Sequence, residues 1–172
     1  MSHDWRKCIF VAMTIGLISD THAQLHPGVR RAFRCVDQIW HAGDVGGEAV
    51  LEELAALAPV VAIHGNADPP ELQQRLPAHR IVECGGVRAL LVHHAQDGKR
   101  WRAGVTELIA ATRPAVVVFG HSHVQYVAEH DGVLFVNPGG GGRRRFRLRR
   151  SVAVLTTDGG LPRARFVWLD PQ

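Results

Sequence analysis

The chain has 172 residues, which is the length of one domain with a single core, and we expect residues 1–172 to form one domain. A content of 46% hydrophobic and 21% charged residues is typical of a soluble globular protein. Three cysteines, Cys8, Cys35 and Cys84, are an odd number without paired spacing, which argues against a disulfide framework and favours a reducing cytoplasm.

The first predicted element is a buried strand at residues 9–18. Its apolar run resembles a signal peptide because Arg6 and Lys7 precede it, but it is far shorter than the about 20 residues that a membrane-spanning helix needs. Cleavage after the run would also remove Asp20 and His22, which the motifs below place among the candidate metal ligands. We therefore expect no membrane partner.

After this strand, the apolar spacing predicts alternating elements. They are a helix at 26–36, a strand at 37–41, a helix at 47–58 and a strand at 60–63. Alternation of this kind predicts mostly parallel strands whose carboxyl ends share one edge of a sheet.

The second half of the chain has a larger share of predicted strands. It begins with a short helical segment at 69–77, a hairpin at 80–92 that turns at Gly85-Gly86, a helix at 99–112 and a strand at 116–119. Four further strands are predicted at 124–128, 133–136, 151–156 and 163–168. The whole pattern is that of an α/β protein.

Oxygen and imidazole groups follow five of the apolar runs, at the point where each run ends. The blocks are Asp20-Thr21-His22, Gly43-Asp44, Gly65-Asn66, His93-His94 and His121-Ser122-His123. Carboxylate, amide and imidazole groups suit Mn²⁺, Fe, Co²⁺ or Zn²⁺ better than Ca²⁺, which takes oxygen ligands only. Because the blocks share one sheet edge, they predict a two-metal hydrolytic site, and Asp44 has the two oxygens needed to bridge ions about 3.5–4 Å apart.

These blocks, together with Asp68 and Asn137-Pro138-Gly139, resemble the motifs of the calcineurin-like metallophosphoesterases. The resemblance extends from about residue 13 to residue 155 and is strongest to the small single-domain bacterial and archaeal phosphodiesterases, a branch that includes the eukaryotic retromer scaffold subunit. It implies an α/β (α+β sandwich) fold in which two packed mixed β-sheets are flanked by helices in four layers.

The resemblance also implies two divalent metal ions, Mn, Ni, Fe, Co or Zn. One ion would be held by Asp20, His22, Asp44 and His123, and the other by Asp44, Asn66, His93 and His121. Asp44, Asn66 and His93 are then the residues expected to matter most for catalysis.

The chain departs from the family pattern at three places. Ala67 stands where many larger members carry a histidine that assists the leaving group, while Asp68 keeps an acidic position that we expect to act by hydrogen bonding. In the block His93-His94, either histidine could be the metal ligand. We favour His93 because it matches the first histidine of the family motif. Gly140 stands where the family usually has serine.

Six of the 20 basic residues lie in the segment 143–150, and the remaining 14 are outnumbered by 16 acidic residues. We expect Arg143, Arg144, Arg145 and Gly139 to bind the anionic substrate, and the alternative is a solvated basic face. Phe146 is the sole aromatic residue of the run, so no platform for stacking nucleic-acid bases is evident.

The sequence therefore predicts a metal-dependent phosphoesterase, most specifically a phosphodiesterase that hydrolyses a small phosphoester with water activated by two metal ions. One alternative is a protein-interaction scaffold of the same fold without catalysis, and another is a nuclease or RNA-processing phosphodiesterase. The expected partner is a small phosphoester; nucleic acid and a second copy of the chain stay open.

Overall fold

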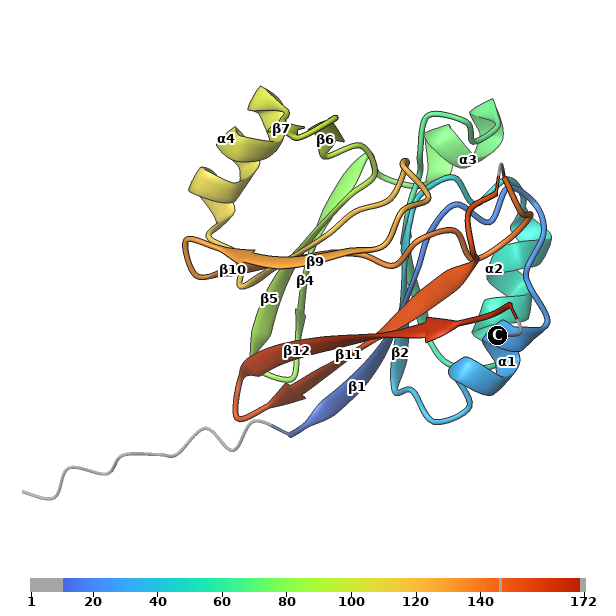
Figure 1. Cartoon of the computed structure of the whole chain (residues 1–172), viewed down its shortest axis with the longest axis horizontal. Coiled ribbons are helices and arrows are strands. Elements are labelled where there is room, and N and C mark those ends of the chain that lie inside the picture. The colour runs from blue at the N-terminus through green and yellow to red at the C-terminus, as the bar shows by residue number, and fades with distance from the viewer. Residues whose placement is uncertain (1–10, 146, 171–172) are drawn as a thin grey trace, which may run out of the picture.

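The computed structural model describes residues 11–145 and 147–170 (Figure 1). The first strand, β1, is Met13–Ile18. Residues 9 and 10 of the predicted strand lie outside the described residues, as does Phe146. None of the described helices is both long and apolar enough to cross a lipid bilayer.

The first half of the chain builds the centre of one sheet. Strand β1 pairs in parallel with β2 (Gln38–Ala42), which pairs in parallel with β3 (Val60–Ile63). The last two strands, β11 (Ser151–Asp158) and β12 (Leu161–Trp168), complete the sheet in antiparallel orientation and give the order β12-β11-β1-β2-β3. Three short helices connect the elements: α1 (Gly28–Ala32), α2 (Glu48–Ala55) and α3 (Pro70–Arg75).

The second sheet has the order β4-β5-β8-β10-β9. The predicted hairpin is present as β4 (His79–Cys84) and β5 (Val87–Val92), and β5 pairs in parallel with β8 (Val116–Val118). Strand β10 (Val133–Asn137) is parallel to β8, and β9 (Tyr126–His130) closes the edge. Helix α4 (Ala103–Thr112) lies on the outer face.

Three groups of buried apolar residues show how the layers pack. Trp40 and Leu17 of the first sheet meet Leu91 of the second in the central group, so the two sheets lie face to face. A second group places α1 and α2 against the outer face of the first sheet, and a third places α4 against the second sheet. The predicted fold class is confirmed, since two mixed five-stranded sheets are packed together with helices outside them (Figure 1).

All four predicted helices are longer than the observed ones, and tertiary contacts end or displace two of them. Helix α1 stops at Ala32, after which the chain turns so that Asp37 Oδ2 accepts a hydrogen bond from Thr14 N–H (2.7 Å) beside β1. Residues 99–102 are not helical; β6 (Gln96–Asp97) and β7 (Arg100–Trp101) form a small hairpin instead. The Trp101 ring packs on Phe135 with ring centres 4.3 Å apart, and this packing outweighs local helix propensity.

Candidate metal centre

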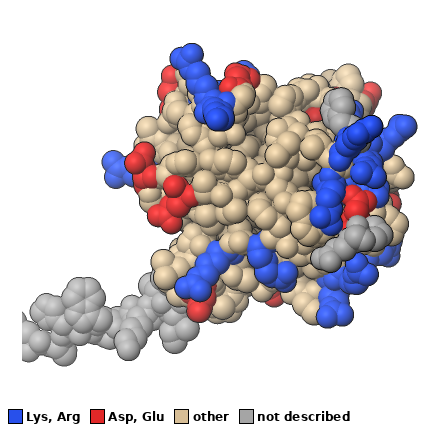
Figure 2. All heavy atoms as spheres, in the orientation of Figure 1, with Lys and Arg blue, Asp and Glu red and all other residues tan. Residues whose placement is uncertain are grey.

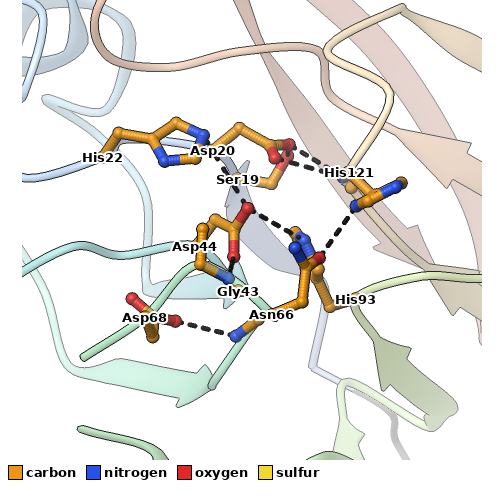
Figure 3. Close-up of polar contacts among 12 residues, drawn as sticks. Ser19, Asp20, His22, Gly43, Asp44, Asn66, Asp68, His93 and His121 are labelled. Atoms are coloured by element: carbon orange, nitrogen blue, oxygen red, sulfur yellow. Dashed lines mark hydrogen bonds and ion pairs between the residues drawn. The ribbon is translucent and has the colours of Figure 1, made fainter. Parts of the chain in front are cut away.

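The five polar blocks follow β1, β2, β3, β5 and β8, and the structure brings them together where the carboxyl ends of strands from both sheets meet (Figure 3). Six of the seven predicted ligands form two compact triads, and within each triad the candidate ligand atoms lie within 4.8 Å of one another. The triads are Asp20, His22 and His123, and Asp44, His93 and His121. Each therefore combines residues from both sheets.

Asp44 lies between the two triads. Its Oδ2 is 3.7 Å from His22 Nε2 and 3.2 Å from His93 Nε2, while its Oδ1 accepts a hydrogen bond from Ala67 N–H (2.8 Å). Burial raises the pKa of Asp44, but the neighbouring His93 imidazole and the Ala67 N–H outweigh it and hold the pKa at about 2. Asp44 is thus an anion at neutral pH, placed where a bridging ligand would have to be.

The ring of His93 is fixed with one nitrogen facing Asp44. Its Nδ1–H donates to the carbonyl oxygen of Ala42 (2.7 Å), which can only accept, so the lone pair of the neutral ring lies on Nε2. This Nε2 is buried and has no hydrogen-bond partner within the described part of the chain. A lone pair that faces a carboxylate at 3.2 Å calls for a cation between them. Burial lowers the pKa of His93, but the carboxylates of Asp44 and Asp20 outweigh it and raise this pKa, so a proton fills the place in the metal-free protein and a metal ion would replace it.

Asp20 is fully buried at the other triad. Its Oδ2 accepts hydrogen bonds from the Ser19 hydroxyl (2.7 Å) and from His121 N–H (3.1 Å), and its Oδ1 is 3.4 Å from His123 Nε2. Burial raises the pKa of Asp20 to about 6, because the surrounding groups compensate its charge only in part. A cation at this place would supply the missing compensation.

His22 and His123 lie ring to ring, with centres 5.1 Å apart, and their Nε2 atoms are 3.2 Å from each other. Burial lowers both pKa values, that of His123 to about 4, and the charge of Arg145 lowers them further. Both rings are therefore neutral at pH 7, and neutral imidazole is the form that coordinates metals.

Asn66 and His94 lie at the rim of the centre. Asn66 is exposed and its Oδ1 is 2.9 Å from His121 Nδ1. His94 turns away from Asp44: its Nε2 is 2.9 Å from Asp97 Oδ1, and its ring stacks on that of His121 with centres 3.8 Å apart. The geometry places His93 inside the centre and His94 beside it.

The backbone at the centre is strained. Five candidate ligands have positive φ values between 47° and 72°, a region that non-glycine residues seldom adopt: Asp20, His22, Asp44, His121 and His123. Such strain costs on the order of 1–3 kcal/mol per residue and clusters at functional sites. Glycines that pack against these carboxylates leave the necessary room, since a Cβ on Gly65 would lie 2.1 Å from Asp44 Oδ1 and a Cβ on Gly120 would lie 2.8 Å from Asp20 Oδ2.

Buried side chains fix the loops behind the ligands. Asp68 accepts hydrogen bonds from Gly46 N–H (2.6 Å) and Gly65 N–H (2.7 Å), as its predicted hydrogen-bonding role requires. Asn137 donates to the Gly120 carbonyl (2.9 Å) and so holds the loop that carries His121 and His123.

A second buried pair, His41 and Thr21, joins the first two ligand loops. His41 Nε2 is 2.9 Å from Thr21 Oγ1, and the Thr21 hydroxyl donates to the Val45 carbonyl (2.9 Å). Sequence reasoning missed Thr21 and the hydroxyl of Ser19; their positions directly beside Asp20 were the available signal.

The predicted substrate-binding residues lie in and after the loop that follows β10. Gly139 is buried, and its N–H already donates to Asn137 Oδ1 (3.0 Å), so this N–H is not directed at a ligand. Arg143, Arg144 and Arg145 are exposed. Figure 2 shows that Lys and Arg side chains gather on one side of the molecule. Among these three, Arg145 is the one whose charge acts on the imidazoles of the centre.

Two packed mixed sheets that carry paired Asp/His triads at a shared strand edge define a metallophosphoesterase fold. The sequence model of the calcineurin-like phosphoesterase superfamily domain matches residues 13–160, and the chain belongs to this superfamily. The family predicted from the motifs is thereby confirmed, and its members' metal chemistry agrees with the two triads.

Two archaeal proteins with similar sequences are named as phosphoesterases. The chain is 33% identical over 156 residues to a probable metallophosphoesterase of Methanothermobacter thermautotrophicus, covering 86% of this chain and 87% of the relative. It is 30% identical over 139 residues to a phosphodiesterase of Methanocaldococcus jannaschii, covering 74% and 83%.

Among solved structures, an archaeal phosphodiesterase is similar with a TM-score of 0.69 and 25% identity, covering 90% of this chain and all of that one. Vacuolar Protein Sorting 29 of Cryptosporidium parvum is similar in fold, with a TM-score of 0.74 and 19% identity over 91% of this chain and 97% of that one.

Proposed function

We propose that this protein is a dinuclear metal-dependent phosphodiesterase that hydrolyses a small phosphoester. The observation that carries the proposal is the position of Asp44 Oδ2 between His22 Nε2 and His93 Nε2, of which the latter is buried without a hydrogen-bond partner in the described part of the chain. In the neutral ring, the lone pair of that nitrogen faces the carboxylate, which is the arrangement that a divalent ion would fill. The archaeal phosphodiesterases similar to this chain support the choice of a diester.

The proposed ligand sets are those expected from the family: Asp20, His22, Asp44 and His123 for one ion, and Asp44, Asn66, His93 and His121 for the other. When bound, a pair of divalent ions neutralises phosphoryl oxygens and lowers the pKa of water towards about 7. The donor set suits Mn, Ni, Fe, Co and Zn, and we propose manganese as the first ion to test.

The remaining polar groups have roles that follow from their positions. Asn66 steadies the His121 ring through the contact of its Oδ1 with Nδ1. Ala67 contributes only its N–H to Asp44, so the leaving group would take its proton from solvent. The proposed substrate contacts are Arg145 first, then Arg143 and Arg144, while Gly139 serves by shaping the turn that carries them. A cytoplasmic location is part of the same proposal.

The scaffold alternative rests on the fold shared with Vacuolar Protein Sorting 29. Complete ligand sets favour the enzyme, because a scaffold gains nothing from five strained ligand residues with positive φ. The nuclease alternative rests on the arginine run alone.

The decisive experiment is to strip the purified protein of metal and reload it with Mn²⁺, Ni²⁺, Co²⁺, Zn²⁺ or Mg²⁺. Each form is then assayed with phosphomonoesters, phosphodiesters and cyclic nucleotides. We expect metal-dependent diester hydrolysis, whereas a protein that binds metal but hydrolyses none of these esters would support the scaffold.

The carboxylate between the triads provides the matched test. We expect Asp44→Asn to lower activity by several orders of magnitude and to reduce the bound metal to one ion or none. Asp158→Asn makes the same chemical change at the exposed end of β11 and should alter neither. Full activity in a metal-loaded Asp44→Asn protein would refute the two-metal proposal.

A further inference from the structure

A cavity of about 580 Å³ opens beside the candidate metal centre. It is continuous with the centre because Gly120 and His121, which follow strand β8, form part of its wall. The β6-β7 hairpin borders it with Gly98 and Lys99. Its volume lies within the range of roughly 300–1,000 Å³ that is usual for small-molecule sites.

Part of the wall of this cavity is aromatic and aliphatic. Phe119 and Tyr126 line it with ring centres 5.8 Å apart, but Phe119 is only 3% exposed, so most of this surface comes from Tyr126 and from Val124, which is 50% exposed. A phosphate ion alone would use none of these groups, since it needs charges and N–H donors. Aromatic walls of this kind favour a planar organic group that can stack on them.

Two polar side chains of the wall, Gln125 and Lys99, could bind polar groups of a ligand. Gln125 lines the cavity, and its amide nitrogen is buried without a hydrogen-bond partner in the described part of the chain. A buried donor of this kind is normally satisfied, and a rotation of the Gln125 side chain would bring it to an acceptor in the cavity. Lys99 is exposed at the border and adds positive charge near the mouth.

We propose that this cavity binds the organic group of the phosphoester, and that this group is a planar aromatic ring system with hydrogen-bond acceptors, as in a nucleotide ester. The phosphorus would then lie at the metal centre, next to His121, with the ring against Tyr126 and Val124. The inference rests on the proposed phosphoesterase function and names its substrate class. It concerns binding, so it can be tested without turnover.

The first test compares two ligands by calorimetric titration of the Mn²⁺-loaded protein. Adenosine 5′-monophosphate should bind at least 10-fold more tightly than inorganic phosphate, because only the nucleotide reaches the cavity. Equal dissociation constants for the two would overturn the inference.

A matched pair of variants locates the effect. Val124→Gln places a polar, uncharged side chain in the cavity and should remove most of the nucleotide's advantage while the affinity for phosphate and the metal content stay unchanged. Val127→Gln makes the same change at a residue of β9 that is 45% exposed and outside the cavity wall, and it should retain the advantage. An equal loss in both variants would contradict the assignment.

The buried amide gives a second, independent test. Gln125→Met keeps the shape but removes the donor, so the affinity for adenosine 5′-monophosphate should fall roughly 3- to 10-fold, the usual effect of one neutral hydrogen bond. Phenyl phosphate has no ring acceptor, and its affinity should not change. If both ligands weakened equally, Gln125 would have no part in recognition.

Failure of the cavity assignment is separable from failure of the proposed function. If the protein hydrolyses no ester but still binds the nucleotide more tightly than phosphate, the proposed binding site is supported and the proposed activity is refuted. If the protein hydrolyses diesters with the same KM for methyl and nucleoside groups and binds the two test ligands equally, the proposed activity is supported and the proposed binding site is refuted.

Discussion

Two adjacent histidines follow strand β5 and face in different directions. His93 Nε2 lies 3.2 Å from the Asp44 carboxylate, while His94 Nε2 lies 2.9 Å from Asp97. Neighbouring residues of an extended chain point to opposite sides, so only one of the two can enter the centre.

The two histidines should therefore respond differently to replacement by alanine. His93→Ala removes a proposed ligand and should lower the metal content from two ions to one. Its loss of activity should exceed the factor of about 10 to 100 that is typical when a residue hydrogen-bonded to a metal ligand is replaced. His94→Ala should retain two ions and show the smaller effect, through its stacking on His121. Metal analysis of both proteins decides, and the reverse pattern would move the ligand to His94.

His41 makes the stability of the metal-free protein depend on pH. Burial lowers its pKa from 6.5 to about 3, so the folded protein keeps the ring neutral while the unfolded chain takes up a proton below pH 6.5. The stabilising effect is complete above pH 6.5 and is lost progressively between pH 6.5 and 3, at up to about 1.4 kcal/mol per pH unit. Denaturant unfolding in the presence of chelator, from pH 7 to 5, measures this slope.

A variant isolates this contribution from other titrating groups. His41→Asn removes the titrating ring, so its unfolding free energy should change less steeply with pH than that of the unaltered protein, whatever its absolute stability. Asp20 works against His41, because its raised pKa makes the folded state hold an extra proton between about pH 4 and 6. An unchanged slope in His41→Asn would show that other groups cause the pH dependence.

At the scale of elements, three arginines of the segment between β10 and β11 make three different kinds of interaction. Arg145 acts electrostatically on the imidazoles of the centre, Arg149 lies over the Trp168 ring at 4.2 Å, and Arg150 is paired with Asp170. The run is therefore neither a uniform basic face nor a uniform grip on phosphate.

This division predicts different kinetics for two exposed arginines. Arg145→Gln should raise KM for anionic substrates about 2- to 5-fold with little change in kcat, as expected for an exposed charge pair, and salt should reduce the difference. Arg147→Gln serves as the control, since Arg147 is exposed and its charge is not among the causes of any shifted pKa in the centre. Identical KM values for the two variants at low salt would show that the arginine run is a solvated face that does not bind substrate.

At the scale of the whole molecule, the centre joins the two sheets. Asp20, His22 and Asp44 follow strands of the first sheet, whereas His93 and His121 follow strands of the second. Metal binding would link the halves that otherwise meet through the apolar layer around Trp40 and Leu91.

Removal of metal should therefore lower the melting temperature of the entire fold. An ion present at 100 times its dissociation constant stabilises the folded state by about 2.7 kcal/mol, which corresponds to roughly 5–11 °C for a chain of this size. Calorimetric scans with Mn²⁺ and with chelator measure the shift, and Asp44→Asn should show little or none. A wild-type melting temperature that is indifferent to metal would mean that the ions do not join the sheets.

The sequence alone determined the family, the order of the elements and the types of the candidate ligands, because these depend on local patterns: apolar runs followed by Asp, Asn or His, with glycine ahead of Asp44, Asn66 and His121. Whether an apolar run becomes a strand is largely decided by its own residues and by the turns beside it.

Only the tertiary structure decided how those residues are used. It assigned Asp20 and His123 to one triad although they are a hundred residues apart, turned His94 outwards, and separated Arg145 from Arg149 and Arg150. It also replaced the start of a predicted helix with the β6-β7 hairpin, which borders the cavity beside the centre. These outcomes depend on contacts between distant segments, whose energies exceed the local preferences that a sequence pattern expresses.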